Sequence, residues 1–176
     1  MNTQTLEHMN TIICPFLFLT AFNLALTACS QNDDLDKKLE NILKYSVPII
    51  KVEEALTQEQ KDNVYFLDTR SNEEYLVSHI PNAIWTGFDK FDIQKVLDIP
   101  KDALIITYCS VGYRSEKIGE KLQESGYKNV RNLYGGIFEW VNKGNEVYNK
   151  FDQPTDSVHT YNRNWAKYLK RGIKVF

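Results

Sequence analysis

The chain has 176 residues, of which 43% are hydrophobic and 25% charged, and its formal net charge is -2 at pH 7. This composition is usual for a globular protein, and the length is sufficient to bury a core within one domain. We expect no nucleic-acid partner, because no surplus of Lys and Arg exists to neutralise phosphates, and the lack of an internal repeat excludes solenoids and propellers.

The N-terminal segment differs in composition from the rest of the chain. Residues 12–28, IICPFLFLTAFNLALTA, carry no charged side chain, have no polar face and are near the lower length limit for a membrane span. The sequence LTAC at 26–29 resembles the lipobox of bacterial lipoproteins, in which the cysteine is lipidated after the preceding peptide is removed. Residues 1–10 depart from this pattern because they lack the basic side chains usual in signal peptides.

We therefore expect residues 1–28 to be a lipoprotein signal peptide and Cys29 to be the lipidation site. A lipid on Cys29 would attach the chain to a membrane of the bacterial cell envelope, at the periplasmic face or in the outer membrane. Removal of Cys14 and modification of Cys29 would leave Cys109 as the only free thiol of the mature protein. An unpaired cysteine in an oxidising compartment is expected to be buried or used in chemistry.

Residues 29–48 are predicted to form a tether and a spacer helix. The polar, acidic sequence at 30–34 is followed by apolar residues at helical spacing, which end before Pro48 and are Leu35, Leu39, Ile42 and Leu43.

Residues 49–144 are predicted to form one α/β domain. Ser71 and Glu74 have capping-box spacing, and the continuous apolar run at 103–108 is typical of a strand that is buried on both faces. Strands alternating with helices indicate a mainly parallel sheet covered by helices on both sides. The predicted strands are 49–52, 64–68, 83–85, 103–108 and 130–134, and the predicted helices are 53–60, 73–79, 91–99, 115–126 and 137–144.

Cys109 lies where the most apolar predicted strand ends and a helix begins, which is where open α/β sheets bind ligands. Gly112 permits a sharp turn, in which backbone N–H groups can form an anion-binding cradle at the positive end of the helix. A thiolate held there should have a lowered pKa, and Arg114 adds a positive charge nearby. From these residues alone, a buried cysteine that packs as a small hydrophobe is an equal interpretation.

Three blocks of sequence favour a chemical role for Cys109 over simple packing. Residues 67–84 are LDTRSNEEYLVSHIPNAI, residues 109–115 are CSVGYRS and residues 133–140 are LYGGIFEW. They resemble, in order, the L-D-V-R-x-x-x-E-Y-x-x-G-H-I-P-G-A, C-x-x-G-x-R-S and L-x-G-G-x-x-x-W blocks of the rhodanese-like, thiosulfate sulfurtransferase-type proteins. The first block departs at Thr69, Ser78 and Asn82 and matches at Asp68, Arg70, Glu74, Tyr75, His79, Ile80, Pro81 and Ala83.

The resemblance implies a three-layer rhodanese-like fold with a five-stranded, mainly parallel sheet flanked by helices. It implies that Cys109 takes a sulfur atom from a small donor, such as thiosulfate or polysulfide, and passes it from a persulfide to a thiol or a cyanide-like acceptor. No metal or organic cofactor is implied. The substrate-binding loop after the nucleophile would be Ser110, Val111, Gly112, Tyr113, Arg114 and Ser115.

The other matching residues are expected to support the loop. Asp68 would anchor the backbone, and Arg70 would pair with an acid such as Glu74. His79 is expected to be a structural hydrogen-bonding residue and Trp140 a core residue. Gly135 and Gly136 would allow the turn from the last strand into the closing helix.

Two other cysteine-based activities fit the sequence less well than sulfur transfer. Cysteine phosphatases have a longer Cys-x-x-x-x-x-Arg loop, and a thioredoxin-like cycle would need an external thiol because no C-x-x-C pair exists. A non-catalytic rhodanese-like module that binds a partner or carries sulfur stays as the alternative. Ser110 and Val111 stand where some thiosulfate-using members have basic residues, so a polysulfide or a protein persulfide is an alternative donor to thiosulfate.

Residues 145–176 extend beyond the blocks and are predicted to pack on the domain. A short helix is expected at 162–171, and Tyr161, Trp165 and Tyr168 are expected to anchor it. A partner surface or a wall of the active-site mouth are the other interpretations of these aromatic residues.

Overall fold

The computed structural model describes residues 32–59 and 61–176. The predicted signal peptide and the lipidation site at Cys29 lie outside these residues. Within the described part of the chain, no helix has the length and apolar character needed to cross a bilayer. The description below concerns the compact unit from Leu35 to Phe176.

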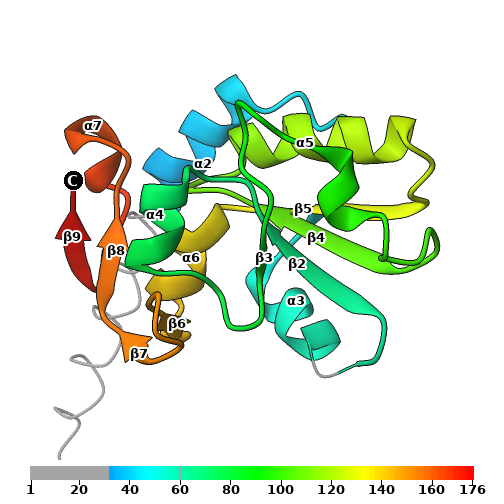
Figure 1. The fold of residues 1–176 in the computed structure, drawn as a ribbon. Coiled ribbons are helices and arrows are strands. Elements are labelled where there is room, and N and C mark those ends of the chain that lie inside the picture. The colour runs from blue at the N-terminus through cyan, green and yellow to red at the C-terminus, as the bar shows by residue number, and fades with distance from the viewer. Residues whose placement is uncertain (1–31, 60) are drawn as a thin grey trace, which may run out of the picture. The chain divides into compact units, whose positions relative to one another are not determined.

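Strands and helices alternate through about the first three quarters of this unit (Figure 1). The elements up to the closing helix are α2 (Asn32–Ile42), β1 (Ile49–Ile50), α3 (Val52–Glu59), β2 (Val64–Asp68), α4 (Asn72–Val77), β3 (Ile84–Trp85), the 3-10 helix η1 (Ile93–Val96), β4 (Leu104–Tyr108), α5 (Tyr113–Glu124), β5 (Asn129–Leu133) and α6 (Gly136–Asn142). The elements that follow are β6 (Val147–Tyr148), β7 (Pro154–Thr155), β8 (Ser157–His159), α7 (Arg163–Ala166) and β9 (Ile173–Val175).

The predicted five-stranded parallel sheet is confirmed. Its strand order is β1-β5-β4-β2-β3, and every neighbouring pair is parallel. Asp68 at the end of β2 is in register with Tyr108 at the end of β4 and with Trp85 at the end of β3. The carboxyl ends of these three strands therefore meet at one edge, where Cys109 begins the next loop.

The central strand β4 is buried on both faces, as its apolar sequence predicts. Ile105 packs in a cluster with Ile118 and Leu122 of α5, whereas its neighbour Ile106 packs in a second cluster with Trp140 of α6. Successive side chains of a strand point to opposite faces, so two adjacent isoleucines serve two layers. Figure 1 shows α5 and α3 on opposite sides of the sheet.

The predicted helix at 91–99 is a single 3-10 turn. The apolar residues Ile93, Val96 and Ile99 recur every three positions, and Val96 and Ile99 are buried. A spacing of three suits a 3-10 helix, in which residues three apart lie above one another. The Asp92 side chain caps the turn by accepting the Gln94 N–H at 2.9 Å.

The C-terminal extension contains a shorter helix than predicted at 162–171, because α7 ends at Ala166. The amide oxygen of Asn142 accepts the backbone N–H groups of Lys170 (2.6 Å) and Arg171 (3.3 Å), which removes these donors from a helix. Strands β8 and β9 form a parallel pair instead. Tyr168 and Leu169 are buried within the main core cluster, so this part of the extension packs on the α/β layers.

Candidate active site

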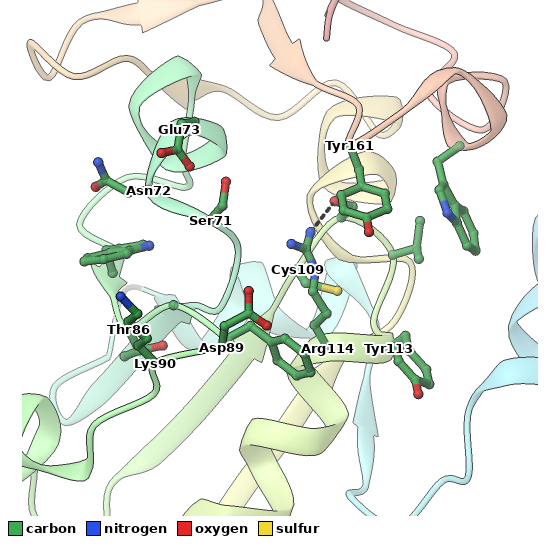
Figure 2. Close-up of a pocket in the computed structure, with 16 residues that line it drawn as sticks. Ser71, Asn72, Glu73, Thr86, Asp89, Lys90, Cys109, Tyr113, Arg114 and Tyr161 are labelled. Atoms are coloured by element: carbon green, nitrogen blue, oxygen red, sulfur yellow. Dashed lines mark hydrogen bonds between the residues drawn. The ribbon is translucent and has the colours of Figure 1, made fainter.

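Cys109 lies in the loop that joins β4 to α5, with only 2% of its surface exposed (Figure 2). Gly112, the N-cap of α5, has a φ of 122°, a conformation that L side chains rarely adopt. This turn directs the Gly112 N–H at the Cys109 sulfur, with 3.1 Å between the two atoms. The thiol therefore lies at the positive end of a helix and accepts a backbone hydrogen bond.

Two opposing effects act on the ionisation of Cys109. Burial alone would raise the pKa of the thiol, and the positive charge of Arg114 lowers it. Backbone N–H groups of Ser115, Gly112 and Val111 lower the pKa further, and the net result is a pKa below the ordinary value of 9.0. The loop thus favours the thiolate, which is the nucleophilic form of cysteine.

The side chains of Ser115 and Asn132 hold the loop from inside the protein. The Asn132 amide donates to the Gly112 carbonyl at 3.0 Å, and the Ser115 hydroxyl donates to the Asn132 amide oxygen at 2.7 Å. Both residues are fully buried. Ser115, expected as part of the substrate-binding loop, therefore fixes the loop conformation from behind.

The N-terminus of α6 holds the other side of the loop. Ile137 N–H donates to the Cys109 carbonyl at 2.9 Å, and Phe138 N–H donates to the Ser110 carbonyl at 3.2 Å. A Cβ atom added to Gly136 would lie 2.3 Å from the Cys109 carbonyl oxygen, so only glycine allows this approach. The Gly-Gly pair was expected to allow a turn, and the contact between Gly136 and the Cys109 loop could not be read from the sequence.

Glu74 joins the loop to α4. Its carboxylate accepts both terminal nitrogens of Arg114, each at 2.7 Å, and the Ser110 hydroxyl at 3.1 Å. It also accepts the Ser71 N–H at 3.0 Å, which completes the predicted capping box. Burial would raise the pKa of Glu74, but Arg114 outweighs this effect and lowers the pKa to about 2. Glu74 is therefore ionised and paired with the loop arginine.

Arg70 forms an ion pair with an acid, as expected, but the acid is Asp68 and not the suggested Glu74. Arg70 forms its ion pair with Asp68, with 2.6 Å between nitrogen and oxygen, and both side chains are fully buried. The Asp68 carboxylate also accepts the Arg70 backbone N–H at 2.9 Å, because the chain bends back immediately after β2. The Arg70 carbonyl in turn accepts the Trp85 indole N–H at 3.0 Å. Asp68 and Arg70 do not line the pocket around the thiol, and the ion pair fixes the Arg70 backbone that holds the Trp85 side chain.

A pocket of about 620 Å³ opens in front of Cys109 (Figure 2). Of the predicted site residues, Cys109, Ser110, Val111, Tyr113 and Arg114 line it, whereas Gly112, Ser115, Asp68 and Arg70 do not. The rest of the lining comes from the start of α4, from the segment after β3 and from the C-terminal extension. It consists of Ser71, Asn72, Glu73, Trp85, Thr86, Gly87, Phe88, Asp89, Lys90, Tyr161 and Trp165.

The aromatic residues of the extension have two roles. Tyr168 is buried in the core, as predicted, whereas Tyr161 and Trp165 line the pocket. The ring of Tyr161 lies 5.1 Å from the Arg114 guanidinium. Among the described residues, no group of three or more His, Cys, Asp and Glu side chains is arranged to hold a metal ion.

His79 and Trp140 have the structural positions expected of them. His79 is buried, stacks on Tyr75 and has its Nδ1 atom 3.1 Å from the Tyr75 carbonyl oxygen. Trp140 is buried and donates its indole N–H to the Glu146 carbonyl at 2.9 Å. Neither residue lines the pocket in front of Cys109.

Comparison with known proteins identifies the domain. A family model described as the rhodanese-like domain matches residues 51–143. A tRNA uridine(34) hydroxylase from Photorhabdus laumondii is 34% identical over 102 residues, which are 55% of this chain and 29% of the hydroxylase. An adenylyltransferase and sulfurtransferase from Ogataea parapolymorpha is 32% identical over 76 residues, which are 43% of this chain and 20% of that protein. The chain thus spans less than a third of the length of these two relatives.

Solved structures share the fold. A Bacillus halodurans protein superposes with a TM-score of 0.55 at 24% identity, over 65% of this chain and 86% of that chain. A thiosulfate sulfurtransferase from Pseudomonas aeruginosa superposes with a TM-score of 0.54 at 22% identity, over 61% of this chain and 21% of that chain. The matched family residues end before the C-terminal extension, which contributes Tyr161 and Trp165 to the pocket.

Proposed function

The chain belongs to the rhodanese-like domain family, and we propose that it is a sulfurtransferase that moves a sulfane sulfur from a donor to a thiophilic acceptor through a Cys109 persulfide. The observation that carries the proposal is the Cys109 thiol, which lies at the base of a pocket and accepts the Gly112 N–H at 3.1 Å.

In the first step the Cys109 thiolate attacks the outer sulfur of the donor. A new S–S bond forms to Cys109, the S–S bond of the donor breaks, and the electron pair of that bond leaves with the remainder of the donor. With thiosulfate as donor the leaving group would be sulfite. With a polysulfide it would be a polysulfide that is one sulfur shorter. The lowered pKa of Cys109 supports this step because it increases the thiolate fraction near neutral pH.

In the second step the acceptor attacks the outer sulfur of the persulfide. Its S–S bond breaks and its electron pair returns to the Cys109 sulfur, which becomes a thiolate again. The same backbone N–H groups that stabilise the resting thiolate would stabilise the leaving thiolate in this step. The two steps need no net oxidant or reductant.

Steady-state formation of thiocyanate tests the proposal. The purified chain would be supplied with cyanide and either thiosulfate or polysulfide, and Cys109→Ser would serve as control. We expect turnover above the uncatalysed rate with at least one donor, and only the uncatalysed rate in the variant. If the chain takes no sulfur from either donor, the alternative holds, in which it is a rhodanese-like module that binds a partner. If it takes sulfur but releases none to cyanide, it is a sulfur carrier.

We also propose that a lipid on Cys29 holds the domain at a membrane of the bacterial cell envelope. The support is the sequence LTAC at 26–29 after an uncharged apolar run. Expression of the full chain in a bacterial host, followed by fractionation, tests this location. We expect the wild type in the membrane fraction with a lipid-modified Cys29. We expect the Cys29→Ser variant to carry no lipid. An unmodified Cys29 in the wild type would contradict the proposal.

A further inference from the structure

The pocket in front of Cys109 is larger than an inorganic sulfur donor requires. Its volume of about 620 Å³ lies in the range of pockets that bind small organic molecules, which is about 300 to 1,000 Å³. An ion of the size of thiosulfate or cyanide would leave most of this space to water. The space suggests that one of the two substrates of the proposed sulfur transfer is an organic molecule.

Aromatic rings on two opposite segments define the character of this pocket. Trp85 and Phe88 come from the segment after β3, and Tyr161 and Trp165 come from the C-terminal extension. Tyr161 is 55% exposed, which is unusual for a side chain whose only role is to anchor a segment. Aromatic walls with a few polar groups are the usual lining of sites for apolar small molecules.

The charges of the pocket do not favour a strongly anionic acceptor. The Arg114 guanidinium is already held by both oxygens of Glu74, so its charge is balanced within the protein. The other charged side chains of the described lining are the carboxylates Glu73 and Asp89 and the ammonium of Lys90. The described lining thus has no net positive charge, and a Cys109 thiolate adds a further negative one.

The backbone around Tyr161 is fixed before any substrate arrives. Thr160 is buried, and its N–H donates to the Val175 carbonyl at 2.9 Å. Asn162 caps α7, and Tyr161 N–H donates to His159 Nδ1 at 3.1 Å. Figure 2 shows the Tyr161 ring beside the Arg114 side chain. A wall held in this way reduces the entropy that is lost on binding.

On the basis of the proposed function, we propose that the acceptor is a low-molecular-weight organic thiol with an aromatic or branched apolar body. Its body would lie between Trp85 and Tyr161, with its sulfur facing the Cys109 persulfide. The acceptor thiol R–SH first loses its proton to solvent. The resulting thiolate R–S⁻ attacks the outer sulfur of Cys109–S–SH. The S–S bond to Cys109 breaks, its electron pair stays on the Cys109 sulfur, and R–S–SH leaves.

The test compares acceptors on the persulfide form of the full chain. The protein would be loaded with polysulfide, and intact mass would follow the loss of the added sulfur. The acceptors would be 2-phenylethanethiol, the anionic 2-mercaptoethanesulfonate, and cyanide, at one pH. Tyr161→Asn removes the ring and keeps a residue type that tolerates the left-handed backbone at this position, where φ is 63°.

We expect the ratio of the rate constants for 2-phenylethanethiol and cyanide to fall about tenfold in Tyr161→Asn, the size expected for the loss of one ring contact. The corresponding ratio for 2-mercaptoethanesulfonate should stay the same. Phe151→Ala is the matched control, because Phe151 is also in the extension and is 71% exposed but does not line the pocket. Both ratios should be unchanged in this control.

An equal fall of both thiol ratios in Tyr161→Asn, or no fall of either, would overturn the inference. The two levels of failure are distinguishable. A chain that gains no sulfur from any donor fails at loading, which contradicts the proposed function and with it the inference. Alternatively, the chain loads sulfur and transfers it to both thiols with rate ratios that Tyr161→Asn does not change selectively. That result contradicts only the proposed aromatic or branched apolar acceptor and leaves the proposed function intact.

Discussion

Replacing Glu74 by Gln tests how far one buried carboxylate stabilises the Cys109 loop. Gln keeps an oxygen to accept the Ser71 N–H of the capping box but loses the charge that holds Arg114. A shift of the Glu74 pKa from 4.5 to about 2 corresponds to about 3 kcal/mol of native-state stabilisation at neutral pH. Because the folded-state pKa is lowered, this contribution is complete above pH 4.5 and is lost as the pH falls towards 2.

Urea unfolding of the wild type and of Glu74→Gln at pH 7 and pH 3 measures this contribution. We expect the variant to be less stable by about 2 to 3 kcal/mol at pH 7 and the difference to shrink by more than half at pH 3. Other carboxylates titrate in both proteins, so their effect largely cancels in the difference. A difference of the same size at both pH values would refute an origin in the Glu74 charge.

The remaining predictions concern the thiol and the glycine beside it. Arg114→Gln should raise the apparent pKa of Cys109, because the positive charge that lowers it is removed, and the pH dependence of alkylation by iodoacetamide measures this shift. An unchanged midpoint would show that the backbone alone sets the pKa. Gly136→Ala should cost about 2 kcal/mol or more and reduce sulfur loading, because its Cβ would lie 2.3 Å from the Cys109 carbonyl oxygen. Gly126→Ala is the matched control, since its φ of 91° is also positive but no atom lies within 4 Å of the added Cβ, and urea unfolding should show a loss of only about 1 kcal/mol. Equal losses in the two glycine variants would contradict the contact with the loop.

Local patterns predicted most of the α/β layers. The continuous apolar run before Cys109 predicts a strand that is buried on both faces, and β4 is such a strand with Ile105 and Ile106 in separate clusters. Ser71 and Glu74 predict a capping box, and both of its hydrogen bonds are present. These features depend on residues that are close in sequence, so periodicity and spacing are sufficient to find them.

The partners of the charged residues could not be predicted in the same way. Arg70 and Arg114 are both cations near Glu74 in the fold, and sequence spacing favours the nearer one. The bend after β2 instead brings the Arg70 guanidinium back to Asp68, whereas α5 brings Arg114 to Glu74. The choice depends on how two segments 40 positions apart come together.

The pocket wall was the least predictable feature. Tyr161 and Trp165 are separated from Cys109 by more than 50 positions, and aromatic spacing alone does not tell a core anchor from a wall. Asn142 contributes to the path of the extension, because its amide oxygen accepts two backbone N–H groups after α7. The chain then turns into β9, which pairs with β8 and holds the segment that carries Tyr161.

The most direct test of sulfur transfer is the intact mass of the purified chain after exposure to thiosulfate and, separately, to polysulfide. We predict a gain of one sulfur atom on Cys109 from at least one donor, its loss on addition of cyanide, and no gain in Cys109→Ser. No added sulfur from either donor, or equal sulfur on the Cys109→Ser variant, would contradict a Cys109 persulfide.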